Sequence, residues 1–379
     1  MAISRLLRAH SCLSLACATS LVGNFTLSVS SGAAFVSTSS TFRRNSFLSM
    51  STSTTANQVQ VIPGRPTWQQ TMLRIRDPKK SLPFYTDLLG FTLIDQFDFP
   101  QYQFSLYFLT TLPQGETYDL VPGTQKAHDY LWNMEGVALE LTYNYGTEKD
   151  DFKGYHAGNE ERDGFGHIAV NCDDVYAASE KLEKAGCTFK KKPDEGRMKG
   201  LAFVYDNDGY WVELVKRGEN SSIRNEFNFS QTMLRVKDVK KSIAFYQALG
   251  MKVVKELHFD EAGFSLYYLA SSNVPDDADT KTMFQPVLEL THNHGTENDD
   301  NFQHFNGNEE GRQGFGHVGF LVDDVYKACD AIRPMGYGFR KEPDGGSMRG
   351  LAFAYDPDGY SVEIIKRGGI DFGDVKKEG

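Results

Sequence analysis

The sequence has little cysteine, no long apolar run and no excess of basic residues. Its 379 residues include five cysteines without a CxxC spacing, which excludes a disulfide framework or a zinc finger as the basis of the fold. No apolar run approaches the roughly 20 residues of a membrane-spanning helix, which argues against an integral membrane protein. The formal net charge of −10 argues against nucleic-acid binding, because phosphates require a basic surface.

Acidic residues are absent before Asp77, and residues 1–55 hold 21 Ser or Thr and four Arg. Two arginines precede an apolar stretch at 12–22, and the small residues before Phe35 allow cleavage after Ala34, as in a signal peptide. The Ser/Thr-rich tract that follows resembles a transit peptide. We therefore predict that residues 1–60 are a disordered bipartite targeting presequence of the plastid type. A mitochondrial presequence, a plain disordered tail, and a shorter cytosolic form starting at Met50 are the alternatives.

The remainder of the chain is a tandem repeat. QTMLRIRDPKKSLPFYTDLLG at 70–90 matches QTMLRVKDVKKSIAFYQALG at 231–250, and MKGLAFVYDNDGYWVELVKRG at 198–218 matches MRGLAFAYDPDGYSVEIIKRG at 348–368. The copies are 161 residues apart at Gln70/Gln231 and 149 apart at Glu140/Glu289, a difference of 12. We expect the second copy to lack these residues in the loop after SLYYLA.

Each copy contains a fainter internal repeat. A strand-like run, an Asp, an amphipathic helix pattern, a helix-ending Gly and further strand-like runs occur in the same order in each half. The predicted fold class is therefore α+β, with four βαβββ modules in two tandem domains. The predicted boundaries are 1–60 for the presequence, 66–218 and 227–368 for the two domains, and 369–379 for a C-terminal tail.

Four glutamates interrupt the apolar strands that end the predicted modules: Glu140, Glu213, Glu289 and Glu363. A buried carboxylate is costly unless it is paired, protonated or bound to a metal. Strand alternation that turns each Glu toward solvent is the simpler alternative. The recurrence at equivalent positions of all four modules favours a functional site.

The first strands of the modules supply candidate partners for these acids, namely Gln70 and Gln231 in the odd modules and His167 and His317 in the even modules. If two modules pair about a pseudo-two-fold axis, one Gln, two Glu and one His converge. Three oxygens and one imidazole suit a divalent metal with positions left open for water or substrate. Two copies predict two sites.

QTMLR, LELT-x-N-x-GTE, GFGH, MKGLAF and DGYWVEL are motifs of glyoxalase I, and the chain resembles a fused two-repeat form of that family, in the vicinal oxygen chelate superfamily, from about Trp68 to Arg367. The resemblance implies a glyoxalase fold for both domains. It implies lactoylglutathione lyase activity, which converts the hemithioacetal of methylglyoxal and glutathione to S-lactoylglutathione in methylglyoxal detoxification.

The resemblance also implies composite sites, each with residues from both copies. One metal site would be Gln70, Glu140, His317 and Glu363, and the other Gln231, Glu289, His167 and Glu213. Glu363 and Glu213 would act as bases, and Glu140 and Glu289 would serve the opposite hemithioacetal enantiomer. The long acidic loop before GFGH resembles the zinc-using form, with Ni²⁺ as the alternative to Zn²⁺.

Glutathione as cosubstrate requires cations for its carboxylates. Family likeness points to Arg74, Asn144, Arg235, Asn293, Arg162, Arg312, Lys191, Lys341, Met198 and Met348 as substrate-binding residues. One departure stands out: the family has Arg directly before GFGH, where this sequence has Asp163 and Gln313, with Arg one position earlier. We expect either a shifted loop that brings the Arg in, or weaker binding of the glycyl carboxylate.

Two other functions fit the same fold. An extradiol dioxygenase would use His/His/Glu and iron, which the Gln at the first position disfavours. A metal-free binding module of the bleomycin-sequestering type would lack the four ligands. The interpretation retained is an enzyme acting on a small molecule, a monomer with two pseudo-symmetric sites that binds neither nucleic acid nor membrane.

Residues 56–379 should be active without the preceding segment, because the motifs begin at Trp68 and the earlier composition is typical of disorder. The check is glutathione-dependent turnover of methylglyoxal by purified 56–379. A folded but inactive 56–379 protein would contradict the prediction.

Overall fold

Four modules repeat the order strand, helix, three strands, and the predicted α+β class is confirmed. The computed structural model describes residues 61–346 and 348–370. The predicted presequence 1–60 and residues 371–379 of the predicted tail lie outside the described residues. Within the described ranges, none of the helices combines the length and apolar character needed to cross a bilayer.

Modules 1 and 2 are built from the first sequence copy. Module 1 contains β1 (Thr67–Ile75), α1 (Pro78–Pro83), the π-helix η1 (Phe84–Leu88), β2 (Thr92–Phe99), η2 (Pro100–Tyr102), β3 (Phe104–Thr110), α2 (Gln125–Leu131) and β4 (Ala138–Asn144). Module 2 contains β5 (Phe165–Cys172), α3 (Val175–Lys184), β6 (Phe189–Lys191), β7 (Ala202–Tyr205) and β8 (Trp211–Lys216).

Modules 3 and 4 come from the second copy. Module 3 contains β9 (Asn228–Val236), α4 (Val239–Ala248), β10 (Met251–Phe259), η3 (Asp260–Ala262), β11 (Phe264–Ser271), β12 (Val287–Asn293) and η4 (Thr296–Asn298). Module 4 contains β13 (Phe315–Val322), α5 (Val325–Ile332), η5 (Arg333–Met335), β14 (Phe339–Lys341), β15 (Leu351–Tyr355) and β16 (Ser361–Lys366).

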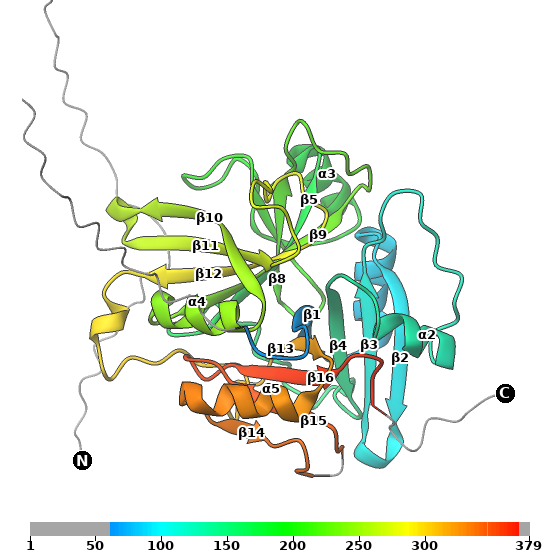
Figure 1. Cartoon of the computed structure of the whole chain (residues 1–379). Coiled ribbons are helices and arrows are strands. Elements are labelled where there is room, and N and C mark those ends of the chain that lie inside the picture. Colours follow the sequence, from blue (N-terminus) through cyan, green and yellow to red (C-terminus); the bar gives the residue numbers. More distant parts are fainter. Residues whose placement is uncertain (1–60, 347, 371–379) are drawn as a thin grey trace, which may run out of the picture. The chain divides into compact units, whose positions relative to one another are not determined.

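Each eight-stranded sheet combines one module from each copy. The first sheet has the order β14-β15-β16-β13-β1-β4-β3-β2, and the second β10-β11-β12-β9-β5-β8-β7-β6. In Figure 1 the blue strand β1 accordingly lies beside the orange strand β13 from the far end of the sequence. At the sheet centres the first strands pair antiparallel, with Gln70 opposite Gly319 and Gln231 opposite Ala169. The last strands of the two modules flank this pair on either side.

Short polar signals start and end the helices, as the sequence predicted. The side chains of Asp77, Asp174, Asp238 and Asp324 accept hydrogen bonds from N–H groups of the first helical turns of α1, α3, α4 and α5, which satisfies donors that have no partner within the helix. Gly186, for example, follows α3 with φ of 89°, a conformation that costs glycine little. Each chain segment is thereby directed back into its sheet.

The π-helix η1 absorbs one residue that the second copy lacks. From Tyr85 to Gly90 the chain advances five residues, whereas from Tyr246 to Gly250 it advances four, and the second copy has the regular helix α4 there. A single inserted residue is accommodated as a local π-turn. The expectation that all 12 missing residues lie in the loop after SLYYLA was therefore wrong by one. The other 11 belong to the loop between β3 and β4, which carries α2.

The main core lies between the helices and the sheets, and it joins residues of all four modules. Two buried tyrosines tie a helix of one module to the β-hairpin of the next. Tyr85 Oη donates to Asp206 Oδ2 at 2.7 Å, and Tyr246 Oη donates to Asp356 Oδ2 at 2.9 Å. Burial, assisted by neighbouring Asp358, raises the pKa of Asp356 to about 8. These contacts hold neighbouring modules together in addition to apolar packing.

Replacing Tyr246 by Phe should destabilise the fold by about 1–3 kcal/mol, because Asp356 keeps its burial but loses one hydrogen-bond partner. Equilibrium urea unfolding measures the change. Tyr337→Phe is the matched control, since the Tyr337 hydroxyl has no recorded hydrogen bond within the described part of the chain. Equal stability losses in the two variants would show that the Tyr246 hydroxyl contributes nothing specific.

Candidate metal centres

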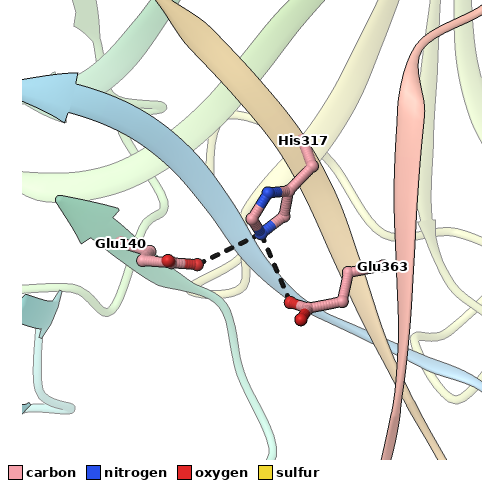
Figure 2. Close-up of side chains that lie close together, drawn as sticks. All are labelled: Glu140, His317 and Glu363. Carbon is pink, nitrogen blue, oxygen red and sulfur yellow. Dashed lines mark hydrogen bonds and ion pairs between the residues drawn. The ribbon is translucent and has the colours of Figure 1, made fainter. Parts of the chain in front are cut away.

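The first quartet consists of Gln70 on β1, Glu140 on β4, His317 on β13 and Glu363 on β16. Gln70 Nε2 donates to Glu140 Oε2 at 2.6 Å and to Glu363 Oε2 at 2.7 Å, and lies 3.1 Å from His317 Nε2. His317 Nε2 lies 3.2 Å from Glu140 Oε2 and 3.3 Å from Glu363 Oε2. Figure 2 shows the two carboxylates converging on the same ring nitrogen of His317 from different strands. The structure thus brings one Gln, two Glu and one His together from the two copies.

The second quartet repeats this arrangement with Gln231 on β9, Glu289 on β12, His167 on β5 and Glu213 on β8. Gln231 Nε2 donates to Glu213 Oε2 and to Glu289 Oε2, each at 2.8 Å. His167 Nε2 lies 3.3 Å from Gln231 Nε2, 3.3 Å from Glu213 Oε2 and 4.0 Å from Glu289 Oε2. Two pseudo-equivalent clusters therefore lie at the centres of the two sheets.

The glutamates are buried, so the alternative that each of them points to solvent is wrong. Glu140, Glu289 and Glu363 are 3%, 4% and 7% exposed, and Glu213 is only slightly more exposed. Strand alternation turns these side chains toward the sheet face that lies away from the helices, together with the Gln and His of the central strands. Each cluster thus concentrates two carboxylates in a place where water alone cannot solvate them.

The donor set fits a divalent cation. Ligand atoms about 2.0–2.2 Å from a zinc ion lie roughly 3 Å from one another, and most of the distances within both quartets are close to that value. Gln70 Oε1 has no hydrogen-bond partner among the described residues. The O and N atoms of a side-chain amide have nearly the same shape, and which is which is assigned from hydrogen bonds. Rotating the Gln70 amide by half a turn would direct this oxygen to the centre of the cluster.

The electrostatics of both quartets also favour a cation. Burial raises the pKa of Glu140, and the nearby imidazole of His317 opposes the rise. Burial, with the charge of Glu213, raises the pKa of Glu289 to about 7. For His317, burial lowers the pKa, but Glu140 and Glu363 outweigh it and raise the pKa to about 9. Without a metal the first cluster therefore retains a proton on the imidazole as its positive charge.

Sequence reasoning missed the side chains that orient the ligands. Thr142 Oγ1 donates to Glu140 Oε1 and Thr291 Oγ1 donates to Glu289 Oε1, each at 3.3 Å. The ring of Phe353 lies edge-on to His317 with centroids 5.2 Å apart, and Phe203 does the same for His167 at 5.3 Å. The Thr two residues after each Glu in LELT was the available signal, because residues i and i+2 share a strand face.

Arg74 and Arg235 lie on the same strands as the quartet glutamines and are anchored by similar contacts. Arg74 Nη1 donates to the Phe315 carbonyl at 3.1 Å and Nη2 to Asn308 Oδ1 at 2.8 Å. Arg235 Nη2 donates to Asn159 Oδ1 at 2.8 Å. Burial lowers the pKa of both guanidinium groups. Neither has a carboxylate within salt-bridge distance among the described residues.

The other predicted substrate-binding residues differ between the copies. Asn144 Nδ2 donates to Tyr155 Oη at 2.7 Å, whereas the side chain of Asn293 has no recorded partner in the described region. Lys191 Nζ and Lys341 Nζ donate to the carbonyls of Leu201 and Leu351, each at 2.7 Å. Of the two methionines, Met348 packs against an apolar cluster and Met198 is exposed.

Arg162 and Arg312, which stand one position earlier than the family Arg before GFGH, have different partners. Arg312 Nη2 donates to the buried Asp163 Oδ1 at 2.6 Å, and Asp163 Oδ2 lies 2.7 Å from His156 Nε2. Arg162 instead donates to the Gln303 carbonyl at 3.1 Å. Each arginine therefore contacts the loop of the opposite copy. The described residues contain one further possible metal group, His156, Glu160 and Asp163, where the Arg312 guanidinium already supplies the positive charge.

Comparisons with known proteins point to one family. The family model described as Glyoxalase/Bleomycin resistance protein/Dioxygenase superfamily matches residues 67–214 and 228–364. A lactoylglutathione lyase of Schizosaccharomyces pombe is 42% identical over 300 residues, 78% of this chain and 95% of that protein. A glyoxalase I of Saccharomyces cerevisiae is 40% identical over 310 residues, 79% of this chain and 91% of that protein.

Solved structures agree with this assignment. The crystal structure of glyoxalase I from Zea mays superimposes with a TM-score of 0.59 at 27% sequence identity, and it covers 80% of this chain and 92% of that chain. Sequence and fold comparisons therefore cover nearly the whole of the described region.

Metal-free protein should bind about two divalent ions per chain and release protons as it does so. A ligand nitrogen must be deprotonated to bind, and the His317 pKa of about 9 means that this proton competes at pH 7.5. The apparent Zn²⁺ affinity of the first quartet should therefore rise about tenfold per pH unit below pH 9 and level off above it. Isothermal titration in buffers of different ionisation enthalpy, with elemental analysis, measures both quantities.

One ion or none per folded chain would show that a quartet has lost its affinity. Three ions would point to the His156 group. An affinity that does not change between pH 6 and 8 would contradict the protonated state assigned to His317.

Proposed function

We propose that this chain, which belongs to the Glyoxalase/Bleomycin resistance protein/Dioxygenase superfamily and is a lactoylglutathione lyase, carries out its reaction at two metal sites, each shared between the two sequence copies. The observation that carries the proposal is the convergence of one Gln, two Glu and one His from paired modules, twice in the chain. The substrate is the small-molecule adduct of glutathione and a 2-oxoaldehyde, the hemithioacetal.

The reaction moves a proton between two adjacent carbons of the hemithioacetal. The carbon acid is too weak for a carboxylate in water to deprotonate, and a bound divalent metal supplies the Lewis acidity that stabilises negative charge on the substrate oxygens. Glu363 and Glu213 would take the proton from one carbon and return it to the next. Glu140 and Glu289, on the other flanking strand of each site, would serve the other hemithioacetal enantiomer.

Glutathione would lie along the strands toward the cationic end of each site. Arg74 and Arg235 follow the quartet glutamines by four residues, and both carry a guanidinium without a carboxylate partner in the described region. Asn144 and Asn293 end the neighbouring strands β4 and β12. Lys191, Lys341, Met198 and Met348 would complete the peptide contacts, whereas Arg162 and Arg312 would contribute indirectly, since both bind the opposing loop.

Zinc is the proposed metal, with Ni²⁺ as the alternative, because three oxygens and one imidazole accept either ion. We also propose that the protein is imported into the plastid, on the basis of the acid-free, Ser/Thr-rich sequence before residue 60. We propose that the active form is a monomer, because one chain supplies both complete quartets.

Three double variants test whether the sites are composite. Gln70→Ala/Glu363→Gln removes two members of the first quartet, so the second quartet should keep its activity. Gln231→Ala/Glu213→Gln is the reciprocal control and should leave the first. Glu213→Gln/Glu363→Gln removes the proposed base from both and should lower turnover at least about 100-fold. Absorbance of the thioester formed from methylglyoxal and glutathione, before and after chelator, measures each rate.

Near-total loss in all three variants would contradict the composite model and favour four ligands within each copy. Loss in only one of the first two would identify the remaining quartet as inactive. Chelator-resistant turnover would contradict metal dependence.

A further inference from the structure

The two sites are lined differently beside their equivalent quartets. In the first sheet Phe108 pairs with Glu140 and Asp95 pairs with Phe108, so the three side chains form a row on one face. In the second sheet the equivalent row is Glu289, Tyr268 and Lys255. Directly paired residues point to the same side of a sheet. Both rows therefore extend from the quartet along the face that receives the substrate.

The row of the first site is apolar and closed by α2, the helix in the loop that the second copy shortens. His128 on α2 lies with Nδ1 2.5 Å from Asp95 Oδ2, and both residues are buried. Trp132, directly after α2, meets Phe108 at a centroid distance of 5.5 Å. Asp95 is thus bound to His128, and the wall next to Glu140 presents aromatic surface.

The row of the second site carries two polar groups and is less closed, with the Tyr268 ring packed against the small apolar cluster Ala270, Val274 and Val287. Without the equivalent of α2, Lys255 is only half-buried, and its Nζ lies 5.8 Å from the centroid of the Tyr268 ring. Neither the Lys255 ammonium nor the Tyr268 hydroxyl has a hydrogen bond or ion pair recorded in the described part of the chain. Gln231 is 8% exposed where Gln70 is 1% exposed, which agrees with a more open site.

The orientation of the substrate makes this difference relevant. If glutathione occupies the end of the site marked by Arg74 or Arg235, the substituent of the aldehyde must leave the reacting carbons in another direction. The row beside Glu140 or Glu289 would then face the substituent of the aldehyde. A group two strands from the quartet lies roughly 10 Å away, within reach of a three-carbon aldehyde with a terminal phosphate.

We propose that the second site is selective for glutathione adducts of 2-oxoaldehydes that carry an anionic group, a carboxylate or phosphate, on the carbon beyond the ketone, whereas the first site takes apolar substituents. The Lys255 ammonium pairs with the anion and the Tyr268 hydroxyl donates a hydrogen bond to it. The isomerisation is unchanged, since one proton moves from the first carbon to the second and no co-reactant is needed. The inference rests on the proposed function of both quartets.

Single-site chains separate the two specificities. Glu363→Gln leaves the second site and Glu213→Gln leaves the first. The measured quantity is the ratio of kcat/KM for the glutathione adduct of 3-phosphooxy-2-oxopropanal to that for the adduct of methylglyoxal. This ratio should be about two- to fivefold higher in the chain that retains the second site, as expected for one partly exposed ion pair, and the difference should shrink with added salt.

Lys255→Met in the second-site chain should lower the ratio to the value of the first site, because it keeps the length of the side chain and removes the charge. Lys252→Met is the matched control on the same strand, since Lys252 pairs with Asp276 instead, and it should leave the ratio unchanged. Tyr268→Phe should lower the ratio partly. Competition binding of S-(3-carboxypropyl)glutathione against S-butylglutathione, whose charged group lies beyond the position of the reacting carbons, gives the same preference without turnover.

The outcomes distinguish this inference from the function on which it rests. If neither single-site chain turns over the methylglyoxal adduct, the proposed function of the quartets fails. If both chains turn it over but have equal ratios, or if Lys255→Met leaves the ratio unchanged, the selectivity of the second site is overturned while the function stands.

Discussion

The antiparallel pairing of β1 with β13 and of β5 with β9 is the constraint on which the molecule depends. Each pair brings a Gln and a His from different copies to the centre of a sheet, and the parallel neighbours on either side add one Glu each. Neither copy contains a complete quartet within one sheet. The sites therefore form only when the two copies pair, and separating the copies would leave one carboxylate of each site without its imidazole.

Local rules explain how much of this was predictable. The glutamates in apolar strands, the Asp before each helix and the Gly after it are short-range signals, and they identified the modules. The alignment of the two copies added the Gln and His of the first strands, which the structure brings together with the glutamates. The pairing of copies followed from family likeness and not from pattern. The π-helix was missed because one extra residue before Gly90 looks like loop variation until helix geometry shows where it goes. The partners of Asp95 and Asp163 were missed because His128 and Arg312 reach them through tertiary packing.

The two copies have the same residues in the quartets and different residues beside them, and packing explains this difference. In each quartet the Gln amide donates to both Glu carboxylates and lies 3.1–3.3 Å from the His nitrogen, so a change at one position leaves a buried group uncompensated. Beside the quartet, Phe108 packs against Phe97 and Trp132, and Tyr268 packs against a small apolar cluster, but neither is one of the quartet residues. Tyr268 in place of Phe108, and Lys255 in place of Asp95, change the chemistry beside the site and leave the positions of the metal ligands unchanged. Two sites can thus share chemistry and differ in substrate range.

The loops before β5 and β13 connect the two sites across the pseudo-two-fold axis. Asp163 and Phe305 form a parallel bridge between these loops, His156 N donates to the Gln313 carbonyl at 2.8 Å, and Arg312 binds Asp163. The same loops provide Asn308 for Arg74 and Asn159 for Arg235. The guanidinium group of each site is therefore held by a loop that also contacts the other loop. The Arg312–Asp163 pair has no counterpart in the reverse direction, because Gln313 stands where Asp163 would repeat. Arg312 also lies 3.5 Å from Glu160 Oε2. Among the described residues the recorded ion pairs between these loops therefore come from Arg312 alone, which makes the link between two otherwise similar sites asymmetric.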